Sequence, residues 1–461
     1  MKKETPTSAE ARHIALLKDA AWIDRAFAFA DGYKQFLDAS KTEREATNYA
    51  RQALEKHGFR AFRFGDALKA GDKIYFENRH KSLVAAVIGT APVSEGIRLL
   101  AAHIDSPRLD LKPNPLYEDN ELALLKTHYY GGIKKYQWTT IPLALHGVLM
   151  LADGRKVEVS VGEDEADPVF YIDDLLPHLA QDQMKRSPAD LIKGEELNVV
   201  VGSLPLASDD DSVKQPVKAK VLQLLQEKTG MVERDFLSSE LEIVPAFKAK
   251  DVGLDRALIG AYGQDDRVCA YPALQALLAQ QQPRHTVAVV LTDKEEIGSV
   301  GNSGLQSAYF RYFVAEIAET LGSNERTVLL ASKCLSADVN AAFDPTFASV
   351  SEKMNASYIH RGVVLTKYTG ARGKSGASDA NAEFVAEVQH ALDQADIPWQ
   401  TGELGRVDLG GGGTVAGYLA NLGMEVLDAG VPVLSMHAPY ELTSKLDVYA
   451  SYLAFDRFLK L

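Results

Sequence analysis

Four short apolar segments of the chain each lead to residue types that bind metal ions. The segments and the residues that follow them are 99–102 with His103 and Asp105, 286–291 with Glu295 and Glu296, 328–331 with Asp338, and 431–436 with His437. Apolar runs of this length predict buried, largely parallel strands. In open α/β sheets, ligands bind at the carboxyl ends of the strands. We therefore expect one sheet to gather two imidazoles and several carboxylates at one edge.

The wider pattern predicts a mixed α/β fold with a largely parallel central sheet flanked by helices. Residues 8–57 have a helical pattern, with Thr42 and Glu45 spaced as a capping box. Further strands are expected over 74–76 and 83–88, and the third of the four segments is expected to form a strand over 328–332. Helices are expected over 268–281, 305–321, 378–395 and after Ser444.

A β-rich insertion interrupts this alternation. We expect residues 1–112 and 248–461 to form a discontinuous catalytic domain and residues 113–247 to form an inserted domain. Within it, the polar residues 207–212 are typical of an exposed loop.

Composition narrows the class of protein without selecting a reaction. The 461 residues carry 63 acidic and 50 basic side chains, a net charge of −13, which disfavours nucleic acid and anionic membranes as partners. Cys269 and Cys334 lie in apolar surroundings and cannot make a disulfide framework. The sequence contains neither a secretory signal pattern nor an apolar run long enough to span a membrane. We expect a cytoplasmic location.

The residues after these segments suit hydrolysis at a metal centre. The carboxylate of Asp105, two positions after His103, could orient that imidazole. Two adjacent glutamates can divide the work, one as a metal ligand and the other as a general base. Asp265 could bridge two cations. Taken singly, each motif also has a structural interpretation: Asp265 and its neighbours as a helix cap, and His437 as a buried, hydrogen-bonded histidine.

Five motifs, in their order, resemble the dinuclear zinc aminopeptidases of the aspartyl aminopeptidase and vacuolar aminopeptidase I family. They are His103-Ile104-Asp105, Asp265-Asp266-Arg267, Glu295-Glu296-Ile297-Gly298, Ala337-Asp338-Val339 and Ser435-Met436-His437. The similarity extends from about residue 15 to the C-terminus.

The resemblance implies a role for each matching residue. Asp265 would bridge two divalent ions, zinc by preference, with cobalt or manganese as alternatives. His103 and Asp338 would complete one ligand set, and Glu296 and His437 the other. Asp105 would orient His103, and Glu295 would be the general base. The family also implies peptide substrates with a free N-terminus. It further implies a homo-oligomer, often a dodecamer, with the insertion as an oligomerisation and lid domain.

The tract after Gly132 departs from the aspartyl aminopeptidases, where His-Thr-Trp-Phe-Asp-Arg is typical. Here Tyr136 stands for the histidine and Ile141 for the arginine, while Trp138 matches. Without that arginine, we expect neutral or apolar N-terminal residues to be cleaved at least as well as acidic ones, with Tyr136 and Trp138 lining the pocket.

Two other classes of function stay open. A metal deacylase or carboxypeptidase would need a cation for a substrate carboxylate, and Arg372 or Lys374 could supply it. A non-catalytic scaffold on the same fold is expected to have lost ligands, yet the full set is present.

Overall fold

The structure, a computed structural model, describes residues 12–207 and 214–461. The expected exposed loop therefore lies almost entirely outside the described residues, as does the beginning of the helical stretch expected from residue 8. The chain divides into two compact units. The first comprises Met1–Asp105, Ala249–Met436 and Glu441–Leu461, and the second comprises Ser106–Lys248 and His437–Tyr440.

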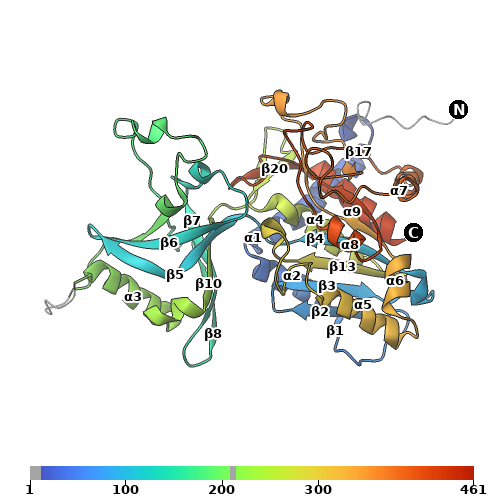
Figure 1. Cartoon of the computed structure of the whole chain (residues 1–461), viewed down its shortest axis with the longest axis horizontal. Helices are drawn as coiled ribbons and strands as arrows, with labels where there is room; N and C mark the ends of the chain where they lie inside the picture. The colour runs from blue at the N-terminus through green and yellow to red at the C-terminus, as the bar shows by residue number, and fades with distance from the viewer. Residues whose placement is uncertain (1–11, 208–213) are drawn as a thin grey trace. The chain divides into compact units, whose positions relative to one another are not determined.

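A nine-stranded sheet forms the centre of the first unit (Figure 1), in the order β1-β2-β3-β13-β4-β14-β18-β16-β17. Its strands are β1 (Arg60–Ala61), β2 (Lys73–Asn78), β3 (Ser82–Val87), β4 (Ile97–His103), β13 (Thr286–Thr292), β14 (Lys333–Ser336), β16 (Val363–Thr366), β17 (Trp399–Thr401) and β18 (Glu425–Gly430). The neighbours β13, β4, β14 and β18 run parallel, whereas β3 and β16 are antiparallel to β13 and β18. The expected mixed, largely parallel sheet is confirmed.

Helices cover both faces of this sheet. They are α1 (Ala20–Asp38), α2 (Glu43–Lys56), α4 (Gln264–Leu278), α5 (Tyr309–Thr320), α6 (Glu325–Ala331), α7 (Ala382–Gln394), α8 (Ala416–Ala420) and α9 (Lys445–Leu459), with short 3₁₀ turns η1 (Ile14–Leu16), η2 (Val93–Glu95), η7 (Glu295–Ile297) and η8 (Ala348–Val350). The expected capping box is present at the start of α2, where Thr42 and Glu45 bond each other's backbone N–H groups.

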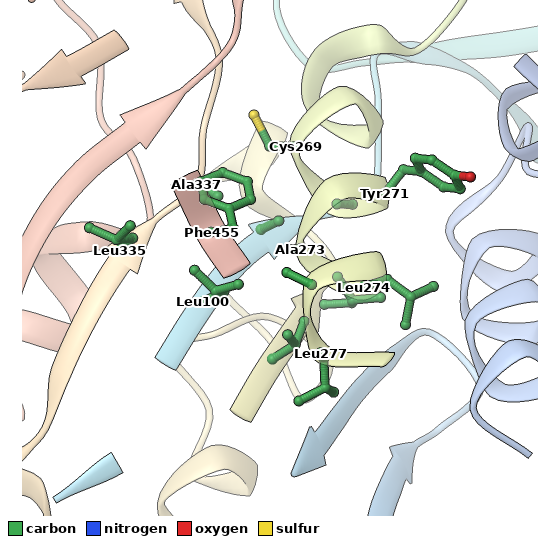
Figure 2. Packing of buried hydrophobic residues seen from close by; sticks show 14 of the residues in the cluster. Leu100, Cys269, Tyr271, Ala273, Leu274, Leu277, Leu335, Ala337 and Phe455 are labelled. Carbon is green, nitrogen blue, oxygen red and sulfur yellow. The ribbon is translucent and has the colours of Figure 1, made fainter. Parts of the chain in front are cut away.

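Alternate residues of each central strand point into two separate cores. In β4, Leu100 packs with α4 and α9, whereas Leu99 packs on the opposite face with α5 and α6. Figure 2 shows part of the first core, which includes Leu100 of β4, Leu335 of β14, Leu274 of α4 and Phe455 of α9. Because both faces are covered, strands such as β4 and β13 contain continuous rather than alternating apolar runs.

The prediction of a strand over 328–332 is wrong. Residues 325–331 form helix α6, which begins at the Asn324 side chain as it accepts the N–H of Thr327, and the strand follows at Lys333. Only one side of the segment is buried, since Val328 is fully buried whereas Leu330 is 69% exposed. A run of four apolar residues is thus compatible with a short helix that has one buried face as well as with a buried strand.

The expectation that all four segments share one sheet is also wrong. Residues 432–434 form β19, which belongs to a second, five-stranded sheet of the first unit, in the order β11-β12-β20-β19-β15. Its strands are β11 (Lys250–Val252), β12 (Leu258–Ala261), β15 (Asn340–Ala341), β19 (Pro432–Leu434) and β20 (Glu441–Ser444). In the large sheet the strand next to β14 is instead β18, the segment just before β19.

The second unit contains a six-stranded antiparallel sheet and one long helix. The sheet has the order β8-β7-β10-β5-β6-β9. Its elements are β5 (Arg108–Asp119), β6 (Leu122–Tyr130), β7 (Leu143–Met150), β8 (Lys156–Val161), β9 (Asn198–Gly202), β10 (Ser239–Pro245), α3 (Pro216–Thr229) and 3₁₀ turns η3 (Lys135–Trp138), η4 (Gln183–Lys185), η5 (Gly194–Glu196) and η6 (Glu233–Ser238). In the part of the chain that the structure describes, every helix is too short or too polar to cross a lipid bilayer.

Candidate metal centre

Three neighbouring strands of the large sheet, β13, β4 and β14, end at the same edge and carry the candidate site. In the parallel register His103 of β4 pairs with Thr292 of β13, and Ser336 of β14 pairs with Ala101. The residues just beyond these ends are therefore near neighbours. Asp265 and Asp266 approach from the start of α4, which packs against β4.

His103 lies at the centre of the acidic side chains. Its Nε2 atom is 3.1 Å from Asp265 Oδ1 and 3.9 Å from both Glu295 Oε2 and Asp338 Oδ1. His103 belongs to two triads of potential metal ligands, one with Asp265 and Glu296 and the other with Asp266 and Asp338. Within each triad, the potential ligand atoms lie within 4.8 Å of one another. The structure thus brings together every sequence-predicted ligand of the first unit.

Asp105 holds two parts of the site in place. Its carboxylate accepts the backbone N–H groups of Glu295 (3.1 Å) and Glu296 (3.2 Å), and Oδ1 also lies 3.4 Å from Nδ1 of His103. Its backbone carbonyl lies 3.0 Å from the same Nδ1. One fully buried aspartate therefore fixes the turn that carries both glutamates and the ring of the histidine.

Burial and mutual repulsion disturb the ionisation of this cluster. Burial raises the pKa of Asp266 and of Asp338 well above the usual range, and the charge of Asp266 raises that of Asp338 further. Burial alone would lower the pKa of His103, but Asp105, Asp265 and the other nearby carboxylates raise it well above its usual value. The cluster therefore favours positive charge at its centre.

This donor set fits a divalent metal ion. Imidazole nitrogen and carboxylate oxygen are ligands of zinc, and several carboxylates converging on one point are stabilised by a cation. The hydrogen bonds that orient His103 and the two glutamates from behind are the outer-sphere support that such ligands need.

His437 belongs to the second unit. Its backbone is in the left-handed region (φ 65°), and its ring Nδ1 lies 2.7 Å from the carbonyl oxygen of Gly132. Because a carbonyl only accepts, Nδ1 carries the proton, and the neutral form of the ring then has its lone pair on Nε2, where a metal ion can bind. A Cβ atom on Gly132 would lie 3.4 Å from Nδ1, so glycine suits this close approach.

The expected pocket residues have different surroundings. Tyr136, in η3, is 41% exposed, whereas Trp138 is completely buried and offers no open surface. Lys374 lies in a loop of the first unit, where Nζ pairs with Asp379 at 2.9 Å and covers the ring of Tyr368.

The sequence analysis assigned no role to two acidic residues of this region. Asp266 contributes to the second triad and accepts the backbone N–H of His103 at 3.3 Å. Glu441 accepts the backbone N–H groups of Gln264 and Asp265. The only signal for Glu441 was an acid at the start of a buried strand, and its partners are distant in sequence.

Comparisons with known proteins agree on one family. Residues 36–459 match the family model described as aminopeptidase I zinc metalloprotease (M18). A probable M18 family aminopeptidase 1 of Clostridium acetobutylicum is 49% identical over 449 residues, 96% of each chain. The crystal structure of an M18 aminopeptidase from Thermotoga maritima superposes with a TM-score of 0.93 at 42% identity, over 98% of this chain and 100% of that one.

A more distant likeness shows the fold alone. The S. cerevisiae mApe1 dodecamer superposes with a TM-score of 0.76 at 21% identity, over 94% of this chain and 96% of that one.

Proposed function

Because this chain belongs to the M18 family of zinc aminopeptidases, we propose that it removes N-terminal residues at a pair of metal ions with Glu295 as the general base. The proposed ligands are His103, Asp265, Glu296, Asp338 and His437, with Asp265 shared between the ions. The observation that carries the proposal is the position of His103, which belongs to both triads of potential ligand atoms. When bound, two divalent ions would lower the pKa of a water molecule, polarise the scissile carbonyl and anchor the substrate amine.

The two glutamates have separate roles in this scheme. Glu296 belongs to a triad of potential ligand atoms, whereas the Glu295 carboxylate lies 3.9 Å from His103 Nε2 and outside both triads. We assign Glu295 the transfer of a proton from the attacking water to the leaving nitrogen. Asp105 keeps both in register, because its one carboxylate holds their adjacent N–H groups.

The proposed substrates are peptides with a free N-terminus and a neutral or apolar first residue. Tyr136 is the pocket residue we retain, because it is exposed whereas Trp138 is buried. We propose a homo-oligomer in which the second unit forms contacts between copies and covers the sites. We also propose a cytoplasmic location, to which the two buried free cysteines are suited.

One assay separates this function from the deacylase, carboxypeptidase and scaffold alternatives. Hydrolysis of a leucyl amide and of its N-acetylated form would be followed before and after treatment with a chelator. We expect turnover of the free amine only, its loss with chelator, and its return on addition of zinc. Cleavage of the N-acetylated form, or no turnover of either, would contradict the proposal.

A further inference from the structure

The start of α4 is an irregular segment that carries Asp265. Gly263 has a left-handed backbone (φ 72°), and Asp265 (ψ 109°) and Asp266 (ψ 27°) depart from helical angles. The first N–H groups of a helix have no carbonyl partners within that helix. In α4 the non-helical backbone angles extend to Asp265 and Asp266, within the helix itself. The N–H groups of this segment therefore need hydrogen-bond acceptors from other parts of the chain, and these acceptors set the direction of the Asp265 side chain.

Glu441 supplies that support. Its Oε2 atom accepts the N–H of Gln264 at 2.6 Å and the N–H of Asp265 at 3.2 Å. The strand register explains the contact, because β20 pairs with β12 so that Glu441 lies opposite Ala261, just before the turn that leads to α4. The side chain is buried, with 1% of the residue exposed.

The side chain of Gln264 also holds the segment before Asp265 in place. Its Nε2 donates to the carbonyl of Glu441 at 2.7 Å and to the carbonyl of Ile259 at 3.0 Å. Its Oε1 accepts the hydroxyl of Tyr33 at 3.2 Å, and the residue is fully buried. The segment before Asp265 is thus tied to β12, β20 and α1 at once.

A carboxylate is a costly choice at this position. A neutral Ser, Thr or Asn is sufficient to cap a helix, whereas a buried charge needs compensation. Bonds from N–H groups to a carboxylate are roughly twice as strong as bonds to a neutral acceptor, so Glu441 holds the segment more firmly. We propose that Glu441, with Gln264, is a positioning residue that fixes the backbone of Asp265 and so the angle at which this carboxylate meets the metal ions. This inference rests on the proposed role of Asp265 as a ligand.

Zinc binding to the purified full-length protein tests the proposal. After removal of metal, the zinc dissociation constants of wild type and Glu441→Gln would be measured by competition with a chromophoric chelator. Loss of outer-sphere support typically weakens metal binding by about 10- to 100-fold, and we expect a rise in that range. The kcat for a leucyl amide should fall at saturating zinc while KM changes little, because Glu441 is buried and only 1% of the residue is exposed.

Asp447 provides a matched control. It is also a fully buried acid that accepts two backbone N–H groups, those of His360 and Gly362, both at 2.7 Å, but these belong to no candidate ligand segment. Asp447→Asn is expected to lower the thermal unfolding temperature and to keep the wild-type zinc dissociation constants. Equal zinc binding in Glu441→Gln and Asp447→Asn would overturn the proposal.

Two further variants keep the proposal testable if Glu441→Gln does not fold or if Asp265 is not a metal ligand. Tyr33→Phe removes one hydrogen bond from Gln264, and we expect zinc to bind roughly fivefold more weakly, the equivalent of about 1 kcal/mol; unchanged binding would overturn the proposal even if Glu441→Gln does not fold. Asp265→Asn is the reference. Normal zinc binding in Asp265→Asn would refute the ligand assignment and this inference together, whereas weak binding there with normal binding in Glu441→Gln refutes the positioning role alone.

Discussion

Several acidic side chains of the first unit have one of two different roles. Asp105, Glu441 and Asp447 each accept two backbone N–H groups and so fix the path of the main chain. Asp265 and Asp338 instead converge on His103. Within the first group, Glu441 holds the segment that carries Asp265, and Asp105 holds the turn that carries Glu295 and Glu296.

Replacing Glu295 by Gln should abolish turnover and leave metal binding intact. The amide is nearly isosteric but cannot accept a proton, and loss of general-base catalysis costs on the order of 10²–10⁴ in rate. The comparison is Glu296→Gln, one residue away on the same turn, which should lose metal. Metal content by mass spectrometry and kcat for a leucyl amide would be measured for both. The reverse pattern, with metal lost in Glu295→Gln only, would exchange the two roles.

The sequence of the tract after Gly132 leads to a prediction about substrate specificity. With Ile141 in place of an arginine, the tract after Gly132 has no guanidinium to grip a substrate carboxylate with two hydrogen bonds. We expect kcat/KM for leucyl and alanyl amides to equal or exceed that for aspartyl and glutamyl amides. A hundredfold preference for the acidic pair would mean that other cations, such as Lys134 or Lys135, replace the arginine.

Secondary-structure elements decide which parts of the site could be foreseen. The runs before His103 and Glu295 were predictable because β4 and β13 are buried on both faces and keep continuous apolar sequences. Residues 328–331 were not, because a short helix with one buried face has the same four apolar letters. This error did not change the set of candidate residues, because strand β14 ends two residues before Asp338.

Contacts between elements far apart in sequence were beyond prediction. The support of Asp265 by Glu441 depends on the pairing of β12 with β20, which joins residues about 180 positions apart. Nothing local in either segment encodes that register. The burial of Trp138 is likewise a property of tertiary packing, and the motif alone suggested an open aromatic surface.

An ion-pair cluster that joins three elements leads to a prediction about stability and pH. Asp251 of β11 pairs with Lys34 of α1 (2.7 Å), Lys445 of α9 (2.8 Å) and Arg256 (2.9 Å). Burial acts to raise the pKa of Asp251, but these cations lower it below its usual value. Asp251→Asn should lower the free energy of unfolding at pH 7 by about 3 kcal/mol, because Lys445 stays buried without its partner.

The sign of the pH effect follows from the lowered pKa. The ionised carboxylate stabilises the folded state above the unfolded pKa of about 4, and this contribution is lost as the pH falls further. Urea denaturation should therefore show a constant deficit in Asp251→Asn between pH 8 and 5 that shrinks toward pH 3. Asp31→Asn, at the exposed partner of Lys34, is the control and should cost less than about 1 kcal/mol. A deficit that grows on acidification would contradict this account.

At the scale of the whole molecule, the second unit carries exposed apolar side chains that suit contacts between copies. Leu175, Leu176, Leu179 and Met184 are each more than half exposed. Exposed apolar side chains gathered in one segment mark interaction sites. These four lie within ten residues of one connecting segment between β8 and β9.

Light scattering should therefore give a mass several times the 50.3 kDa of one chain. A double Leu176→Asp, Leu179→Asp variant should reduce that mass, because burying two new charges between copies is unfavourable. Leu254→Asp, at a fully exposed leucine of the first unit, is the control and should leave the mass unchanged. A stable monomer of the wild-type chain would refute the oligomer.

The stoichiometry of metal and activity tests the central claim most directly. Protein freed of metal would be titrated with zinc while bound zinc and the hydrolysis of a leucyl amide are recorded together. The account predicts two ions per chain, with full activity only as the second is bound, because the ligand sets share Asp265 and both ions are required. Full activity at one ion per chain, or a single bound ion at saturation, would contradict it.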